Sequence, residues 1–163
     1  IFCYNLAFEL NNMNINFFMK KAIEHAREAL LINEVPIGAV LVENKTQKII
    51  NFAHNLVNKS NSAIAHAEII LINKVVKQLD KKYLDGTSIF VTLEPCAMCS
   101  AAISEMRIER IYFGAYDEKN GSLESIMKVY NHKNYYTPQI YGGISEIECS
   151  HLLKKFFKDK RVK

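Results

Sequence analysis

The chain has 163 residues, of which 49% are hydrophobic and 23% are charged, a balance that is ordinary for one globular domain with a real core. The longest apolar stretch, around residues 63–72, is interrupted by His66 and Glu68 and is too short to cross a bilayer. The formal net charge of +4 is compatible with an anionic partner without requiring one. Composition therefore predicts a soluble domain and argues against membrane insertion.

The first dozen residues differ from the rest of the chain. They are apolar in places, but they have no basic start and are interrupted by Asn5 and Glu9, so they do not resemble a secretion signal. We expect a poorly ordered extension over residues 1–12 and a single domain over residues 13–163. Cys3 and Cys149 have no patterned spacing, so we expect a reducing, cytoplasmic setting rather than a disulfide framework.

Hydrophobic patterning predicts strands separated by helices. Runs that are rich in β-branched and aromatic residues predict strands at 35–42, 48–53, 87–93, 108–115 and 137–141, the first two as a hairpin. Gly38 inside the first strand indicates a close backbone approach or a bulge. This order of elements predicts an α/β fold in which a mixed sheet lies between layers of helices.

Five helical segments are expected before, between and after these strands. Apolar positions recur at helical spacing over residues 15–33, and Ser62 is a candidate cap for a helix that reaches residue 79. Pro95 suits the first position of a third helix, and a short one is expected over residues 121–130. Ser145 and Glu148 have the spacing of a capping box, which predicts a last helix with a basic end.

A zinc site is indicated by Cys96 and Cys99 read together with His66. The two cysteines are three residues apart at the start of a predicted helix, so both thiolates fall on one face, where the positive end of the helix favours them. One histidine completes a set of three ligands and leaves the fourth position of a catalytic zinc open. A lone Cys-x-x-Cys would be weak evidence, because redox pairs and structural zinc sites share it; the combination with His66 is far more specific.

Glu68 is the candidate proton shuttle of such a site. It follows His66 by two residues in an otherwise apolar segment, where an unpaired surface carboxylate would be costly to bury. A carboxylate there can take a proton from an activated water and pass it on. A His-x-Glu followed by a Pro-Cys-x-x-Cys is the pattern of zinc-dependent nucleobase deaminases.

From about residue 17 to residue 161 the chain resembles the bacterial tRNA adenosine deaminases, which are members of the cytidine deaminase-like superfamily. The matching segments are 34–40, 66–69, 91–99, Arg107-Ile108 leading to 113–115, Gly114 to Asp117, and a basic last helix with Phe156-Phe157. The resemblance departs at residues 62–64 and at His54. It implies a three-layer α/β/α fold with a central mixed five-stranded sheet.

The resemblance also implies roles for particular residues. His66, Cys96 and Cys99 would hold one zinc ion per subunit, with Glu68 as the proton shuttle. Further residues would contact the substrate. Asn55 would contact the purine, and the Ala67 backbone N–H would face the reacting substituent. The RNA would be contacted by Phe157, Lys158 and Lys160. The family is homodimeric and converts the wobble adenosine of a tRNA anticodon loop to inosine.

Two other functions compete with this one. A deaminase of the same fold that acts on free guanine, cytosine, cytidine or a nucleotide would share the zinc motif, but a small neutral base has no need of the basic tail at residues 154–163. A catalytically silent, zinc-bearing RNA-binding subunit would have no reason to keep Glu68. The tail itself admits a solvated, frayed terminus as its plainer explanation.

Overall fold

The computed structural model describes residues 13–161, so the extension expected over residues 1–12 lies outside the described residues. The elements in chain order are α2 (Ile15–Leu31), β1 (Gly38–Glu43), β2 (Ile49–His54), α3 (Ala67–Leu79), β3 (Thr87–Leu93), α4 (Ala97–Glu105), β4 (Arg110–Ala115), the 3-10 turn η1 (Val129–Asn131), β5 (Gln139–Tyr141) and α5 (Glu146–Arg161). None of the helices in the described range has the length and apolarity that a membrane crossing needs.

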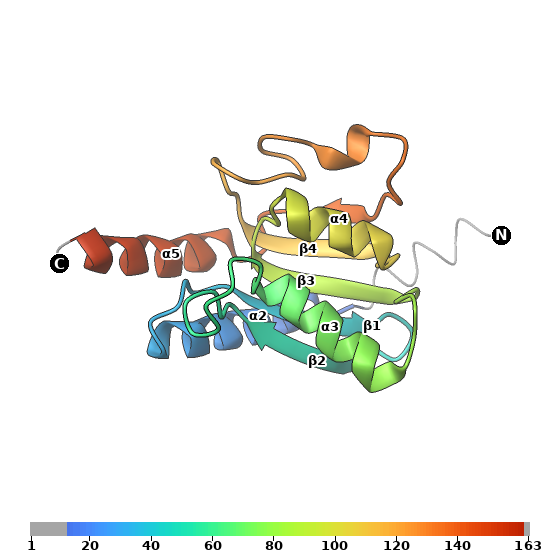
Figure 1. Ribbon diagram of the computed structural model, residues 1–163, viewed down its shortest axis with the longest axis horizontal. Helices are drawn as coiled ribbons and strands as arrows, with labels where there is room; N and C mark the ends of the chain where they lie inside the picture. Colours follow the sequence, from blue (N-terminus) through green and yellow to red (C-terminus); the bar gives the residue numbers. More distant parts are fainter. Residues whose placement is uncertain (1–12, 162–163) are drawn as a thin grey trace.

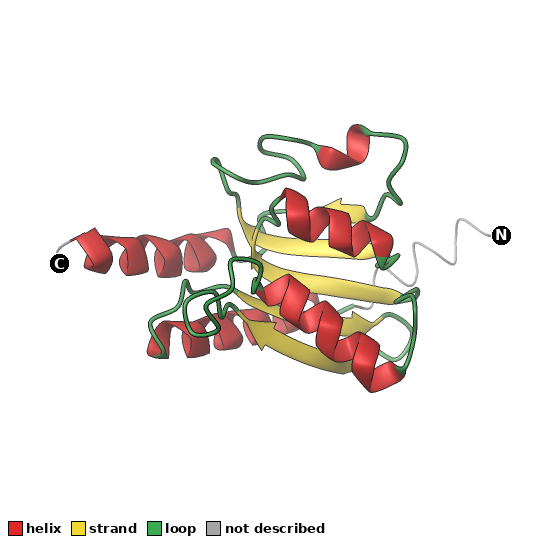
Figure 2. Cartoon of the chain, in the orientation of Figure 1, coloured by secondary structure: helices red, strands yellow, loops and turns green. Residues whose placement is uncertain are grey.

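One five-stranded sheet in the order β2-β1-β3-β4-β5 forms the middle layer. β1 runs antiparallel to both β2 and β3, whereas β3, β4 and β5 are mutually parallel. Helices cover the sheet, as Figure 2 shows. The prediction of a mixed five-stranded sheet in a three-layer α/β/α fold is therefore confirmed.

Alternation along the strands separates the two core regions. Leu41 and Ile89 point to one face, where they pack in a cluster with apolar residues of α3 and α4. Val40 and Phe90 point to the other face, where they pack with residues of α2 and α5. The same two layers are visible in Figure 1, in which α3 and α4 lie in front of the sheet and α2 lies behind it.

Gly38 marks the closest approach between a helix and the sheet. A Cβ atom there would lie 2.1 Å from the Ala22 carbonyl oxygen and 2.4 Å from the Ala26 nitrogen, both in the α2 backbone. Only a residue without a side chain fits, because the obstacle is backbone. The close backbone approach predicted at Gly38 is confirmed.

Four predictions about the helices are wrong. Residues 121–130 form turns instead of a helix, with only η1 at their end, because a buried carboxylate binds their backbone N–H groups. α3 begins at Ala67 rather than at Ser62, and α4 begins at Ala97, after Pro95. Ser145 has a φ of 55°, which is unsuitable for a capping box.

α5 is packed at its beginning and projects at its end. Cys149, Leu152 and Phe156 are its buried residues, and Cys149 and Leu152 pack in the core cluster on the sheet face that α2 also covers. Figure 1 shows the rest of the helix extending past the edge of the sheet. Its basic end is therefore displayed at the end of the molecule where β3 and β4 terminate.

Candidate metal centre and substrate cavity

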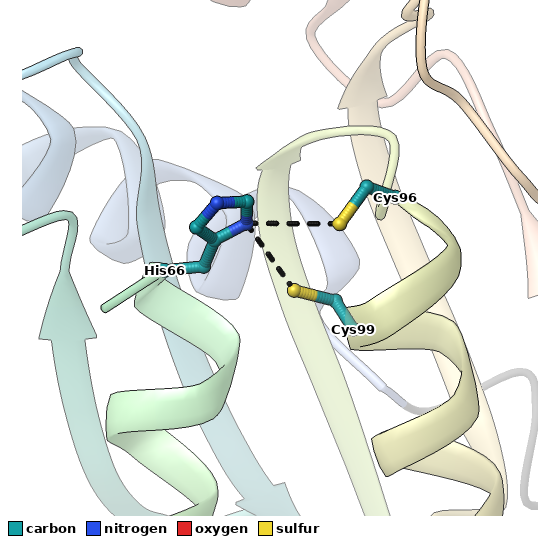
Figure 3. A group of neighbouring side chains, drawn as sticks. All are labelled: His66, Cys96 and Cys99. Atoms are coloured by element: carbon teal, nitrogen blue, oxygen red, sulfur yellow. Dashed lines mark hydrogen bonds between the residues drawn. The ribbon is translucent and has the colours of Figure 1, made fainter. Parts of the chain in front are cut away.

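Two helix N-termini bring the predicted zinc ligands together. His66 is the N-cap residue of α3, Cys96 is the N-cap residue of α4, and Cys99 lies in the first turn of α4. Their ligand atoms all lie within 4.8 Å of one another, and the three side chains converge on one point (Figure 3). The positive ends of both helices face this point, where they favour thiolates.

The spacing of these atoms fits a zinc ion. The His66 Nδ1 atom lies 3.7 Å from the Cys96 Sγ atom and 3.5 Å from the Cys99 Sγ atom. Tetrahedral coordination with ordinary Zn–N and Zn–S bond lengths separates a nitrogen and a sulfur ligand by about 3.6 Å. One imidazole and two thiols are also a donor set that zinc prefers. Three protein ligands leave one tetrahedral position for water or substrate.

Hydrogen bonds among His66, Cys96 and Cys99 shift the pKa values of all three groups. A hydrogen bond from the Cys99 thiol, followed by one from His66, lowers the pKa of the Cys96 thiol to about 4 against the opposing effect of burial. The contact with Cys96, together with burial, raises the pKa of Cys99, and a hydrogen bond with Cys96 raises the pKa of His66. Because zinc binds thiolates and neutral imidazole, its binding to these groups would release protons.

Glu68 lies beside the metal site in the first turn of α3. Its side chain is only 4% exposed, and it faces the same cavity as His66 and Cys96. Burial raises the pKa of the Glu68 carboxyl group, which makes this group better able to hold a proton near neutral pH. The position and environment of Glu68 suit the predicted proton shuttle.

An open cavity of roughly 1150 Å³ lies over this site. The ends of the parallel strands β3 and β4 contribute Leu93 and Ala115 to its wall, as expected for a site in an open α/β sheet. The loop after β4 contributes five residues, namely Tyr116, Asp117, Glu118, Lys119 and Asn120. α5 contributes most of the rest, namely Glu146, Ser150, Leu153, Lys154, Phe157, Lys158 and Arg161.

The predicted substrate-binding residues are not all in this wall. Phe157 and Lys158 line the cavity, but Lys160 does not: its Nζ atom lies 5.5 Å from the Phe156 ring centroid. Asn55 is 3% exposed, and its Nδ2 atom donates to the Glu34 Oε2 atom at 3.1 Å instead of lining the cavity. Ala67 is the first residue of α3, so its N–H has no acceptor within the helix. The contacts predicted between these five residues and RNA stay predictions.

Sequence reasoning missed part of the wall. Lys154 and Arg161 line the cavity, and their spacing from Phe157 and Lys158 is helical, so a single face of α5 could have been found from the sequence. Glu94 and the loop at residues 117–120 gave no periodic signal. Their place in the wall depends on contacts between segments that are distant in the sequence.

Comparisons with known proteins agree with this geometry. The family model for the cytidine and deoxycytidylate deaminase zinc-binding region matches residues 13–115. A tRNA-specific adenosine deaminase of Rickettsia bellii is 44% identical over 144 residues, which are 88% of this chain and 99% of the relative.

Two solved structures share the fold. One, from studies of tRNA deaminases that edit adenosine to inosine at the wobble position, is 40% identical, covers 84% of this chain and 99% of its own, and has a TM-score of 0.80. A guanine deaminase of Nitrosomonas europaea has a TM-score of 0.75 over 86% of this chain and 83% of its own, but at 19% identity it is evidence for the fold alone. By this extent of identity and coverage, the chain belongs to the tRNA-specific adenosine deaminase family.

Proposed function

We propose that this protein is a zinc-dependent hydrolase that converts the wobble adenosine of a tRNA anticodon loop to inosine. The observation that carries the proposal is that one cavity joins two kinds of residue. The deaminase groups His66 and Glu68 lie in its wall together with Phe157 and Lys158 of the basic helix α5. A deaminase that acts on RNA needs both kinds of residue, because positive charges bind the phosphates and aromatic side chains stack on the bases.

Zinc, held by His66, Cys96 and Cys99, would activate a water molecule for attack at neutral pH. Glu68 takes a proton from that water, and the water oxygen forms a bond to C6 of adenine. Glu68 passes this proton to the ring nitrogen N1, then takes the second proton from the oxygen now bonded to C6 and passes it to the exocyclic amine, whose bond to C6 breaks. Adenosine and water become inosine and ammonia, and Glu68 returns to its starting state.

The α5 wall gives RNA an advantage over a free base. Lys154, Lys158 and Arg161 place positive charge along one face of the helix, and Phe157 is 46% exposed beside them. A base in an anticodon loop is already unpaired, so moving it into a pocket costs less than extracting it from a duplex. Phe157 can stack on a neighbouring base while the cations contact phosphates.

The alternative of a free-base deaminase shares the metal centre. The guanine deaminase with the same fold shows that this scaffold also accommodates an enzyme for a small purine. What favours RNA here is the charged wall, because a neutral base without a phosphate gains nothing from Lys154, Lys158 and Arg161. We therefore assign the tRNA substrate to this chain.

The test compares substrates with the zinc-loaded protein. A tRNA with adenosine at the wobble position, free adenosine, free cytidine and free guanine are each incubated, and released ammonia and the modified nucleoside are measured. We expect inosine in the tRNA alone. Turnover of a free base or nucleoside, with none in the tRNA, would reassign the enzyme to salvage of small substrates and leave the metal site intact.

A homodimer and a cytoplasmic location belong to the same proposal. Three large apolar side chains, Ile64, Ile126 and Met127, are between 55% and 60% exposed, as expected of surface that a second subunit covers. Cys96, Cys99 and Cys149 are all free thiols, which suits a reducing compartment. Sedimentation equilibrium should give twice the monomer mass, and a single monomeric species would contradict the dimer.

A further inference from the structure

Glu94 is a buried carboxylate that binds one loop with both of its oxygens. It directly follows β3 and is only 2% exposed. Its Oε1 atom accepts the backbone N–H groups of Leu123, Glu124 and Ser125 at 3.0, 2.8 and 3.0 Å. Its Oε2 atom accepts the Asp117 N–H at 3.2 Å and the Ser125 hydroxyl. Five donors from residues 117–125 thus converge on one side chain; these residues are called the pocket loop below.

These contacts use up the hydrogen-bonding capacity of Glu94. A carboxylate has about four lone-pair sites, and five donors fill them. Within the described residues no salt bridge includes Glu94, so the N–H groups and the hydroxyl are what stabilises its charge. Glu94 is therefore not available to exchange protons with a substrate, in contrast to Glu68. A buried carboxylate in this state fixes the conformation of its donors.

The pocket loop is also attached to the segment that carries the metal ligands. Gly121 forms a β-bridge with Cys96, and the Ser122 N–H donates to the Pro95 carbonyl at 3.0 Å. The Ser122 hydroxyl lies 2.7 Å from the Ser100 hydroxyl of α4. Movement of the loop is thereby tied to the position of the metal segment.

Gly121 shows how tightly the loop closes around the carboxylate. A Cβ atom at Gly121 would lie 2.3 Å from the Glu94 Oε2 atom and 2.6 Å from the Asp117 carbonyl oxygen. The carboxylate thus fits against bare backbone, with no room for a side chain between them. Any displacement of the carboxylate would be transmitted to the loop directly.

The other half of the pocket loop forms a wall of the substrate cavity. Residues 117–120 line the cavity, and their turn is closed by the Asp117 Oδ1 atom, which accepts the N–H groups of Lys119 and Asn120 at 3.0 and 3.1 Å. We propose that Glu94 is a positioning residue: it holds residues 117–120 at a fixed place relative to the metal ligands, so that the target nucleotide is oriented for attack. This inference rests on the proposed function.

Glu94→Gln is the sharpest variant, because it keeps the shape of the side chain. In either orientation of the amide, its NH₂ group replaces a carboxylate oxygen that had accepted hydrogen bonds. Because an NH₂ group can only donate, those hydrogen bonds are lost. Misplacement of a bound substrate by about 1 Å can cost ~100-fold in rate, so we expect the single-turnover rate of inosine formation at saturating enzyme to fall about 10- to 100-fold. Zinc content and affinity for the tRNA should be unchanged, and hydrogen exchange in residues 117–125 should be faster.

The single-turnover rate separates positioning from a loss of folded protein. At saturating enzyme an inactive fraction does not change the rate constant, whereas a misplaced nucleotide does. Glu109→Gln is the matched control: Glu109 accepts the Gly86 N–H at 3.0 Å and the Asn44 amide at 2.8 Å, at the opposite end of the strands. We expect that control to keep the wild-type rate and the wild-type exchange of the pocket loop.

Two further variants approach the same contact from the loop, should Glu94→Gln fail to fold. Ser125→Ala removes one donor, and Gly121→Ala forces a methyl group against the carboxylate; both should slow the single-turnover rate in the same direction. A wild-type rate in all of the folded variants, or loss of zinc as the cause of a slower rate, would overturn the proposal. If the wild-type protein does not act on tRNA, the proposed function fails, while hydrogen exchange in Glu94→Gln still shows whether Glu94 holds the loop.

Discussion

The metal centre and the basic helix α5 meet in one cavity but are built in opposite ways. The metal centre lies at two helix N-termini, where Cys99 is buried and His66 and Cys96 are half-buried, and each ligand is held by an element that packs on the sheet. The outer end of α5 carries its functional residues on an exposed face, with Phe156 as its last buried contact. The contrast teaches that chemistry here depends on fixed geometry, whereas RNA binding depends on the sum of exposed charges and one aromatic ring. Substitutions in the metal centre should therefore abolish or greatly slow deamination, whereas single substitutions on α5 should weaken RNA binding by smaller steps.

Removal of the metal should have the largest effect. Dialysis against a strong chelator, or Cys99→Ala, removes zinc or a zinc ligand, and we expect deamination to fall below detection because no water is then activated. Zinc added back to the chelated wild-type protein should restore the rate, and the measurement is inosine formed per bound zinc. Cys149→Ala is the matched control, since Cys149 is buried in the core away from the trio. Full activity of zinc-free protein would refute the metal role.

Glu68→Ala comes next in size. Loss of a general acid or base lowers a rate by about 10²- to 10⁴-fold, and we expect kcat to fall in this range while zinc content and tRNA affinity stay at wild-type values. Glu105→Ala, at the exposed end of α4, should leave all three quantities unchanged. Loss of zinc from Glu68→Ala would show that this residue supports the metal rather than the proton transfer.

Alanine substitutions at the two adjacent phenylalanines of α5 should have different effects, one on tRNA binding and the other on the stability of the fold. Phe157 is 46% exposed in the cavity wall, and loss of one base-stacking contact costs ~1–3 kcal/mol, so Phe157→Ala should weaken tRNA binding about 5- to 150-fold with little change in melting temperature. Phe156 is 6% exposed, and truncation of a buried phenylalanine costs about 3–5 kcal/mol of stability. Equal effects of both substitutions on binding would contradict a stacking role for Phe157.

Single charges on α5 should have the smallest effect. Lys158 lines the cavity and Lys160 does not, so Lys158→Ala should weaken tRNA binding and lower the salt slope of the affinity by about 1. Lys160→Ala should change the slope less, and it is the matched control for the loss of one charge. Titrations over a range of salt concentrations measure both variants. Identical slopes for the two variants would mean that position on the helix does not matter.

The metal ligands could be predicted from the sequence more completely than the loops and the cavity wall around them. His66, Cys96 and Cys99 could be assigned because ligand type and spacing are local properties, and the strand at 87–93 has the same bounds in the structure. The helix predicted over 121–130 is absent because the backbone donors of Leu123, Glu124 and Ser125 bind Glu94, a contact across about thirty residues that no periodicity reveals.

The cavity wall was predicted only in part for the same reason. Phe157 and Lys158 were assigned from the resemblance, and the structure brings both to the metal cavity. Lys160 was assigned with them from the same resemblance, but a helix turns by about 100° per residue, so residues close together in the sequence face different directions. Which face of α5 meets the cavity is decided by Cys149, Leu152 and Phe156, which pack on the other side.

One measurement tests the central claim that this metal centre acts on a single nucleotide presented by an anticodon loop. The zinc-loaded protein is incubated with an anticodon stem-loop that carries adenosine at the wobble position, and with a second stem-loop in which that adenosine is moved by one position. Inosine is then located by nuclease digestion and mass spectrometry. We predict conversion of the wobble adenosine alone. Conversion at both positions, or of free adenosine but of neither stem-loop, would contradict this account.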